Sequence, residues 1–200
     1  MATAVVRPDG IRMNIASVTL AALNLAVIGL LPRVFFRSDG RLNARWWLTA
    51  TPFFATGVLG FLAAVDVVAA PEPGYDAARA VTAAVLHAVS IGMIALTVGS
   101  HRIPLALWHQ DDDAPRELVT WGPYRHVRHP FYAAFVLCLA GALVTLPHPV
   151  LGAIIVYAIV ALDLTARREE SRLLSSDFGH DYQRYMQATG RLVPMIGRSA

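Results

Sequence analysis

Apolar residues gather in five long runs along the chain, and short polar segments separate these runs. The runs cover residues 14–31, about 46–70, about 80–99, 131–146 and 150 to about 165. A helix that crosses a bilayer needs about 20 mainly apolar residues. Only three residues, numbers 147–149, join the last two runs, so these helices must form an antiparallel hairpin. The pattern predicts an all-α polytopic membrane bundle of about five transmembrane helices.

The composition agrees with a membrane environment. Of the 200 residues, 56% are hydrophobic and 16% are charged, and the mean hydropathy is +0.49. An average globular protein has about 25% charged residues. The single cysteine, Cys138, cannot form an intramolecular disulfide or a CxxC zinc site, and no metal site is expected. The sequence also lacks the GxGxxG dinucleotide motif and the GxxxxGK(S/T) phosphate-binding loop.

All 17 basic residues are arginines, and the formal net charge is +3. Fourteen of these arginines lie in the first polar connection, the third connection and the tail after the last run. Because basic residues mark the cytoplasmic side of short loops, these three segments and the carboxyl terminus are expected on that side. The absence of lysine is typical of a GC-rich bacterial source, so a bacterial inner membrane is expected. Such dispersed charge argues against nucleic-acid binding.

The third polar connection is a candidate ligand site. Gly122 and Pro123 mark a turn, and Pro130 suits the first position of a helix because its φ is fixed and it has no N–H to satisfy. His129 is then expected at or beside the N-cap, where backbone N–H groups favour an anionic ligand group. The positive charge of Arg128 strengthens this preference, so the segment is predicted to bind a carboxylate or a phosphate.

The tail is the second segment with many functional side chains. If the last apolar run continues as one helix beyond Thr165, three charged residues at i, i+4 and i+7 share one face, namely Asp163, Arg167 and Glu170. Glu169 then points about 100° away from Glu170. A short cytoplasmic amphipathic helix is expected farther along, with an aromatic stripe formed by Phe178, Tyr182 and Tyr185. This stripe could cover the membrane surface or a ligand.

Simpler structural interpretations exist for several of these features. Arginines beside a membrane helix commonly only set its orientation, and an aromatic stripe is commonly an interfacial anchor. Asp66 and His87 lie within predicted spans, where ionisable residues suggest a function, but the two side chains could also pair inside the bundle. A transporter or membrane scaffold in which they form a proton relay is the non-enzyme alternative.

Several motifs in the last 40% of the chain occur together in a fixed order. They are Leu118-Val-Thr-x-Gly-Pro-Tyr124, Arg128-His-Pro-x-Tyr132, Glu169-Glu-x-x-Leu173, Phe178-Gly-x-x-Tyr182-x-x-Tyr185 and Pro194. Together they resemble the isoprenylcysteine carboxyl methyltransferase family, in a superfamily of integral-membrane methyltransferases that includes phospholipid methyltransferases. The resemblance covers about residues 116–194. We therefore divide the chain into amino-terminal transmembrane helices and loops (1–115) and a catalytic and donor-binding region (116–200). Arg116 departs from the family pattern, because many members have a histidine there.

The resemblance implies S-adenosylmethionine as the methyl donor, bound in a cytoplasm-facing pocket. The donor carboxylate would lie near His129, and its ammonium would lie near Glu169 or Glu170. Tyr124, Leu118 and the tail stripe would surround the adenine. The implied donor-binding residues are Leu118, Gly122, Tyr124, His129, Tyr132, Glu169 and Tyr182.

The same resemblance places Arg128 and Glu170 in catalysis. The acceptor is expected to be a lipophilic small molecule or a lipid that enters from the bilayer, with O-methylation preferred to S- or N-methylation. A carboxylate acceptor needs no base and would be held by Arg128 in a bidentate contact. A phenol, enol or amine needs a base such as Glu170. A membrane sterol-type reductase that uses NADPH is the alternative enzyme, because those proteins share the Arg-His-Pro-x-Tyr stretch.

Overall fold

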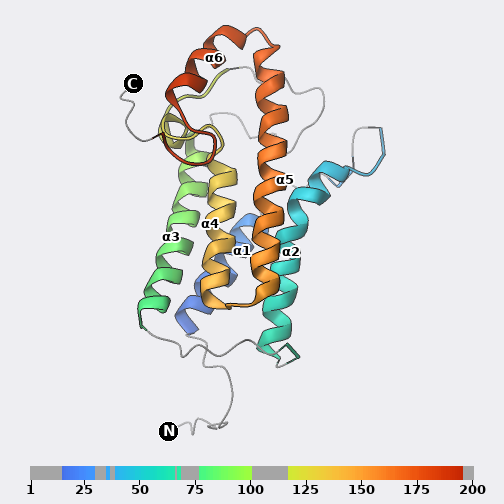
Figure 1. The fold of residues 1–200 in the computed structure, drawn as a ribbon, viewed down its shortest axis with the longest axis vertical. Helices are drawn as coiled ribbons and strands as arrows, with labels where there is room; N and C mark the ends of the chain where they lie inside the picture. Colours follow the sequence, from blue (N-terminus) through green and yellow to red (C-terminus); the bar gives the residue numbers. More distant parts are fainter. Residues whose placement is uncertain are drawn as a thin grey trace, which may run out of the picture.

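The structure is a computed structural model that describes residues 15–29, 35–36, 39–65, 67–68, 77–100 and 117–195. The helices in these ranges are α1 (Ile15–Gly29), α2 (Ala44–Ala64), α3 (Ala77–Ser100), the short 3-10 helix η1 (Gly122–Arg125), α4 (Pro130–Thr145), α5 (Pro149–Leu174) and α6 (Gly179–Ala188). Helices α1 to α5 run along the length of a bundle, and α6 lies across one end of it (Figure 1). The predicted all-α class and the tail helix are confirmed.

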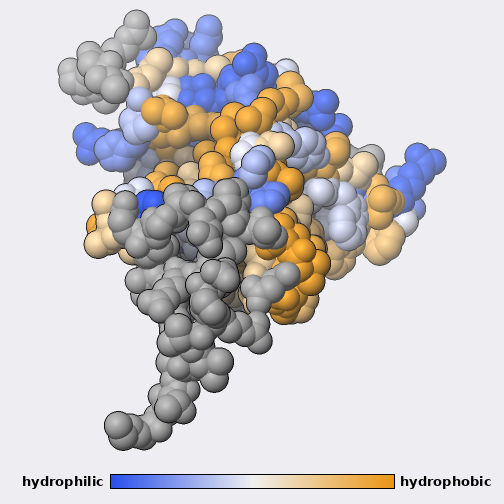
Figure 2. Space-filling model, turned by 60° about the horizontal axis from the view of Figure 1, so that its bottom comes forward, coloured by the Kyte–Doolittle hydropathy of each residue, from blue (hydrophilic) through white to orange (hydrophobic). Residues whose placement is uncertain are grey.

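Three helices, α2, α3 and α5, are long and apolar enough to cross a membrane, and the shorter apolar helices Val18–Gly29 and Pro130–Thr145 account for the other two predicted runs. Phe61, Leu96 and Val156, on three different helices, are 64–66% exposed. Hydrophobic residues cover much of the described surface in Figure 2, and hydrophilic residues lie mainly along its upper edge and at the right. So many exposed apolar side chains are expected on a surface that faces the lipids of a membrane. The predicted polytopic helical membrane protein is confirmed.

Helix α2 differs from the predicted range at both ends. It begins earlier than expected because Asn43 Oδ1 accepts a hydrogen bond from the backbone N–H of Trp46 at 3.3 Å and caps the helix. It ends at Ala64 rather than near residue 70, because the backbone N–H groups of Val67 and Val68 both return to the carbonyl of Leu62. The apolar run therefore continues beyond the helix itself.

The predicted hairpin of α4 and α5 is confirmed, but α5 is longer than its apolar run. His148 is the N-cap of α5, and its Nδ1 accepts a hydrogen bond from the backbone N–H of Val150 at 3.2 Å. The helix continues beyond Thr165 to Leu174, so it has 26 residues and is about 39 Å long. Hydropathy alone misses this extension because its side chains are largely polar. The extension carries the charged residues of the site.

Helix α4 lies in the middle of the bundle, between α3, α5 and α1 (Figure 1). It is apolar on nearly every side, as an enclosed helix must be. Ala134, Phe135 and Leu139 are fully buried. Ile94 of α3 and Leu162 of α5 complete this core. The core lies directly beneath the first turn of α4, where the polar side chains gather.

A small polar cluster joins α1, α3 and α4 inside the bundle. Asn24 Nδ2 lies 3.1 Å from His87 Nδ1, and the Ser90 hydroxyl donates to a backbone carbonyl of α4 at 2.8 Å. All three side chains are fully buried. Gly141 gives the imidazole room, because a Cβ at this position would lie 2.8 Å from ring atoms of His87. Asp66, the other predicted intramembrane ionisable residue, lies outside the described residues.

Candidate functional site

The two segments with the sequence motifs meet at one end of the bundle. Val127 forms a parallel β-bridge with Gly190 in the tail. The backbone N–H of Arg128 donates to the Gly190 carbonyl at 2.8 Å, and that of His129 donates to the Arg191 carbonyl at 3.0 Å. The tail therefore lies against the residues that lead into α4. The described part of the third connection and the tail therefore lie at the same end of the bundle, as the prediction requires.

A tight turn holds this connection on the end of α3. Gly122 has a φ of +60°, and a Cβ there would lie 2.3 Å from Ser100 Oγ. The indole N–H of Trp121 donates to the Ser100 carbonyl at 3.2 Å. His129 is the N-cap of α4 and Pro130 is its first residue, as predicted. Gly122 is thus required by the backbone conformation, whatever contact it makes with a ligand.

Glu170 is the most buried charged group of the site, with 3% of its side chain exposed. Arg128 Nε donates to its Oε1 at 2.9 Å. Arg191 Nε lies 3.1 Å from both carboxylate oxygens, and Arg191 Nη2 donates to Oε2 at 2.7 Å. A buried carboxylate is stable only when it is paired and hydrogen-bonded, and two guanidinium groups meet this need. They also stabilise the anion, so Glu170 is a weak base in this arrangement.

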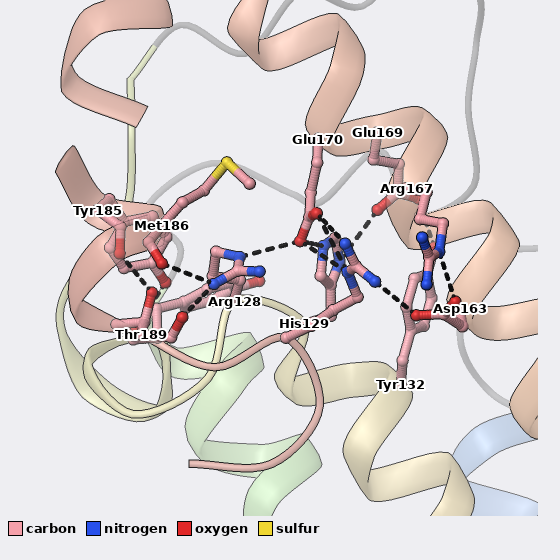
Figure 3. A network of polar contacts seen from close by, with 12 residues as sticks. Arg128, His129, Tyr132, Asp163, Arg167, Glu169, Glu170, Tyr185, Met186 and Thr189 are labelled. Atoms are coloured by element: carbon pink, nitrogen blue, oxygen red, sulfur yellow. Dashed lines mark hydrogen bonds and ion pairs between the residues drawn. The ribbon is translucent and has the colours of Figure 1, made fainter. Parts of the chain in front are cut away.

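Arg128 connects α6 to α5 (Figure 3). Besides its contact with Glu170, Arg128 Nη1 donates to the carbonyl oxygens of Met186 and Thr189. The last carbonyl groups of a helix have no partner within the helix, and the guanidinium supplies one for α6. Only 8% of the Arg128 side chain is exposed. Its contacts hold α6 against the polar extension of α5.

His129 lies between the two adjacent glutamates (Figure 3). Its Nδ1 is 3.2 Å from Glu169 Oε2, and its Nε2 is 3.3 Å from Glu170 Oε1. The two carboxylates leave the helix in different directions, as predicted, but they converge on one imidazole. Tyr132 stacks on His129 with ring centroids 5.3 Å apart, and its hydroxyl donates to Glu169. Burial alone would lower the pKa of His129, but the hydrogen bonds and charges of both glutamates outweigh it and raise this pKa.

A second ion-pair chain adds three residues that the predicted site did not contain. Arg191 Nη1 donates to Asp163 Oδ1 at 2.7 Å, and Arg167 Nε donates to Asp163 Oδ2, also at 2.7 Å. The predicted shared face of Asp163, Arg167 and Glu170 is therefore confirmed, with Arg191 as the bridge. The spacing of Asp163 already indicated this role. Nothing in the spacing indicated Arg191, because its partners lie 21 and 28 residues away along the chain.

The tail stripe faces the connection before α4. The Tyr185 hydroxyl donates to the Tyr124 carbonyl at 2.5 Å, and the rings of Tyr182 and Tyr185 are 5.8 Å apart. Tyr182 is 2% exposed. Burial raises the pKa of Tyr185 to about 12 and raises the pKa values of Tyr124 and Tyr182 farther above the ordinary range. These phenols are therefore neutral, and they form an apolar wall with hydrogen-bonding edges. Leu118 is half-buried in the segment that precedes η1.

Fold and site together define the chain as a polytopic helical membrane protein with an ionic cluster at one end, where a tail helix packs over the bundle. The model of the isoprenylcysteine carboxyl methyltransferase (ICMT) family matches residues 100–175. This range includes Arg128, His129 and both glutamates of the cluster, so the resemblance indicated by the motifs is confirmed. Arg116, which departs from the family pattern, lies within the match but outside the described residues.

A curated relative supports the same family. Protein-S-isoprenylcysteine O-methyltransferase A of Arabidopsis thaliana is 35% identical to this chain over 81 residues, which is 40% of each chain. The chain thus aligns with less than half of the length of this relative. The family model's match, residues 100–175, includes the polar site.

Proposed function

We propose that this protein is an S-adenosylmethionine-dependent methyltransferase that acts on a lipophilic small molecule or a lipid. The main support is that the family-matched segment carries the buried cluster of Arg128, His129, Glu169 and Glu170. A structural ion pair would suffice to hold two helices together. Two adjacent carboxylates that converge on one imidazole at a helix start are a more elaborate arrangement, and binding of a charged ligand explains it.

The residues present fit the methyl donor. His129 Nε2 is buried, and within the described residues it has no well-directed hydrogen bond, although Glu170 Oε1 is 3.3 Å away. Such an orphaned polar atom marks a place where a polar ligand group can bind. Glu169 would take the donor's ammonium, and the wall of Tyr124, Tyr182 and Tyr185 would pack against its adenine. Bound there, S-adenosylmethionine supplies an electrophilic methyl group on a sulfonium.

The protein's contribution would be mainly positioning. Methyl transfer requires acceptor, methyl carbon and sulfur in one line, and holding two reactants in such geometry supplies about 7–11 kcal/mol in well-oriented cases. Arg128 and Arg191 fasten the tail to α5 through Glu170, so they would fix one wall of the site relative to the other. We therefore assign Arg128 a positioning role in the free enzyme.

The preferred reaction is O-methylation of an acceptor that enters from the bilayer. A carboxylate acceptor would need no base. For a phenol or an enol, neither glutamate would be a free base, because two guanidinium groups hold Glu170 as an anion and Glu169 would hold the donor's ammonium. The arginine bias of the connections favours the cytoplasmic side for this end of the bundle, where the donor would be dissolved.

Two measurements test the proposal. Calorimetry of the purified protein should show micromolar binding of S-adenosylhomocysteine, and well-folded protein without such binding would exclude the donor site. Membranes that contain the protein should transfer label from S-adenosylmethionine to a lipid-extractable product that mass spectrometry identifies. Membranes with Glu169→Gln give the matched control, because this change removes a carboxylate of the site while it preserves side-chain size.

A further inference from the structure

We propose that His129 carries a proton in the ligand-free protein and releases it when the donor's ammonium binds beside Glu169. This inference rests on the proposed function, because it concerns the same donor site. It makes donor binding a proton-coupled event and gives His129 a role distinct from that of a carboxylate-binding group.

The geometry around the imidazole supports the protonated form. Both ring nitrogens face carboxylate oxygens, at 3.2 Å for Nδ1 and 3.3 Å for Nε2. A neutral imidazole has only one N–H, so its other nitrogen would direct a lone pair at a carboxylate. Only the imidazolium has an N–H on both nitrogens, so it alone directs no lone pair at a carboxylate, although the Nε2 N–H is not well aligned with Glu170 Oε1. Water offers little compensation, because 9% of the His129 side chain is exposed.

The groups around His129 lead to the same state. Helix α5 contributes the Glu169 and Glu170 carboxylates, and α4 contributes Tyr132, whose ring stacks on the imidazole and whose hydroxyl donates to Glu169. The guanidinium groups of Arg128 and the tail residue Arg191 also lie near His129, but they bind the Glu170 carboxylate. The net effect raises the pKa of His129 despite its burial. The surroundings therefore favour the imidazolium more than water does.

The charge of the described cluster explains why this proton leaves. Its guanidinium groups balance its carboxylates, so a protonated His129 gives the cluster one excess positive charge. The three arginines are Arg128, Arg167 and Arg191, and the three carboxylates are Asp163, Glu169 and Glu170. The donor, with an ammonium, a sulfonium and one carboxylate, also carries one excess positive charge. An arginine cannot lose its proton in a protein, whereas an imidazolium can.

The exchange is balanced in protons and hydrogen bonds. The N–H of His129 that faces Glu169 breaks, and its proton passes to bulk buffer. An ammonium N–H then donates to Glu169, and another can donate to the freed lone pair of the neutral imidazole. Glu169 thus exchanges one cationic partner for another. The cluster gains the ligand without gaining a second excess charge.

Calorimetry in pairs of buffers measures this exchange directly. Full-length protein in detergent is titrated with S-adenosylmethionine at pH 6.5, in buffers that differ in ionisation enthalpy. At this pH an ordinary α-amino group, with a pKa of about 7.7–8.0, is already protonated, so the ligand itself exchanges few protons. We expect net release of protons on binding. Binding without proton release, or with uptake, would overturn the inference and leave the proposed function intact. Absence of binding would overturn both.

Two variants and one spectrum assign the proton. His129→Gln should bring proton release close to zero, whereas His180→Gln on α6, where 81% of the His180 side chain is exposed, should leave release unchanged. If His129→Gln did not fold, nitrogen-15 spectra of histidine-labelled wild-type protein would still decide the question. One imidazole should change from the doubly protonated to the neutral form on ligand addition. No change among the histidines would contradict the inference.

Discussion

Arg128 and Glu170 form a buried ion pair that links the start of α4 to the polar extension of α5, with Nε and Oε1 2.9 Å apart. The same guanidinium also binds the last carbonyl groups of α6. One side chain therefore joins three segments. Its removal would leave a buried carboxylate short of one partner and the end of a helix without a cap.

Arg128→Ala should destabilise the protein by about 3–5 kcal/mol, the usual cost of removing one partner of a buried pair. Arg128→Lys should give an intermediate loss, because a single ammonium cannot reproduce the planar contacts of a guanidinium. Thermal unfolding in detergent measures both. Arg184→Ala is the matched control, because its pair with Asp181 is exposed, and it should change little. Equal stability of the Arg128→Ala and Arg184→Ala variants would refute the assigned role.

Tyr132→Phe should weaken S-adenosylhomocysteine binding about tenfold while the protein stays folded. The variant keeps the ring that stacks on His129 but loses the hydroxyl that donates to Glu169, and hydrogen bonds to charged groups contribute about 1.5–3 kcal/mol. Calorimetry gives the affinity. Tyr157→Phe, which removes a hydrogen bond between α5 and α2, should bind normally. If both variants bind as well as the wild type, Tyr132 does not shape the donor site.

The stability of the ligand-free protein should fall as the pH rises above 6.5. The folded state raises the pKa of His129 above its ordinary value of about 6.5. Its ion pairs therefore stabilise the fold fully below pH 6.5, and this contribution disappears as the pH passes the raised pKa. The difference in unfolding midpoint between wild type and His129→Gln, measured from pH 5.5 to 9, should shrink across this window. A constant difference would exclude a raised pKa.

Gly141→Ala should destabilise the bundle by about 1–3 kcal/mol, as overpacking of a close contact usually does. The new methyl group would lie 2.8 Å from atoms of the buried His87 ring. Gly152→Ala in α5 is the matched control, because a Cβ there meets nothing within 4 Å and alanine favours the helix. Unfolding in detergent should therefore separate the two variants. A Gly141→Ala protein as stable as Gly152→Ala would mean that the imidazole can move aside freely.

The fold could be predicted largely because lipid imposes a simple rule on sequence. Backbone groups within a bilayer must pair internally, so each long apolar run became a helix, and the Pro-His-Pro connection became the hairpin turn. The helix ends were harder. The end of α5 depends on charged side chains that find partners in the tail, and hydropathy does not register such partners. The beginning of α2 depends on one side-chain cap, from Asn43.

The position of the candidate site could be predicted from the sequence, but the contacts among its side chains could not. His129 at the start of α4 and the charged face of α5 followed from helix geometry and from proline preferences. The convergence of Glu169 and Glu170 on one imidazole did not, because helical spacing alone separates the two side chains. Arg191 was missed because its partners are distant in sequence. Contacts of this kind depend on how the tail folds back, which no local pattern encodes.

The unequal lengths of α4 and α5 determine the depth of the polar site. Helix α4 has 16 residues and is about 24 Å long, shorter than the roughly 30 Å hydrocarbon thickness of a bilayer. Helix α5 exceeds that thickness. His129, at the start of α4, therefore lies closer to the middle of the bilayer than the end of α5 does. A lipid could present its head group sideways at this level while its chains stay among those of its neighbours, so the acceptor would not have to leave the membrane to react.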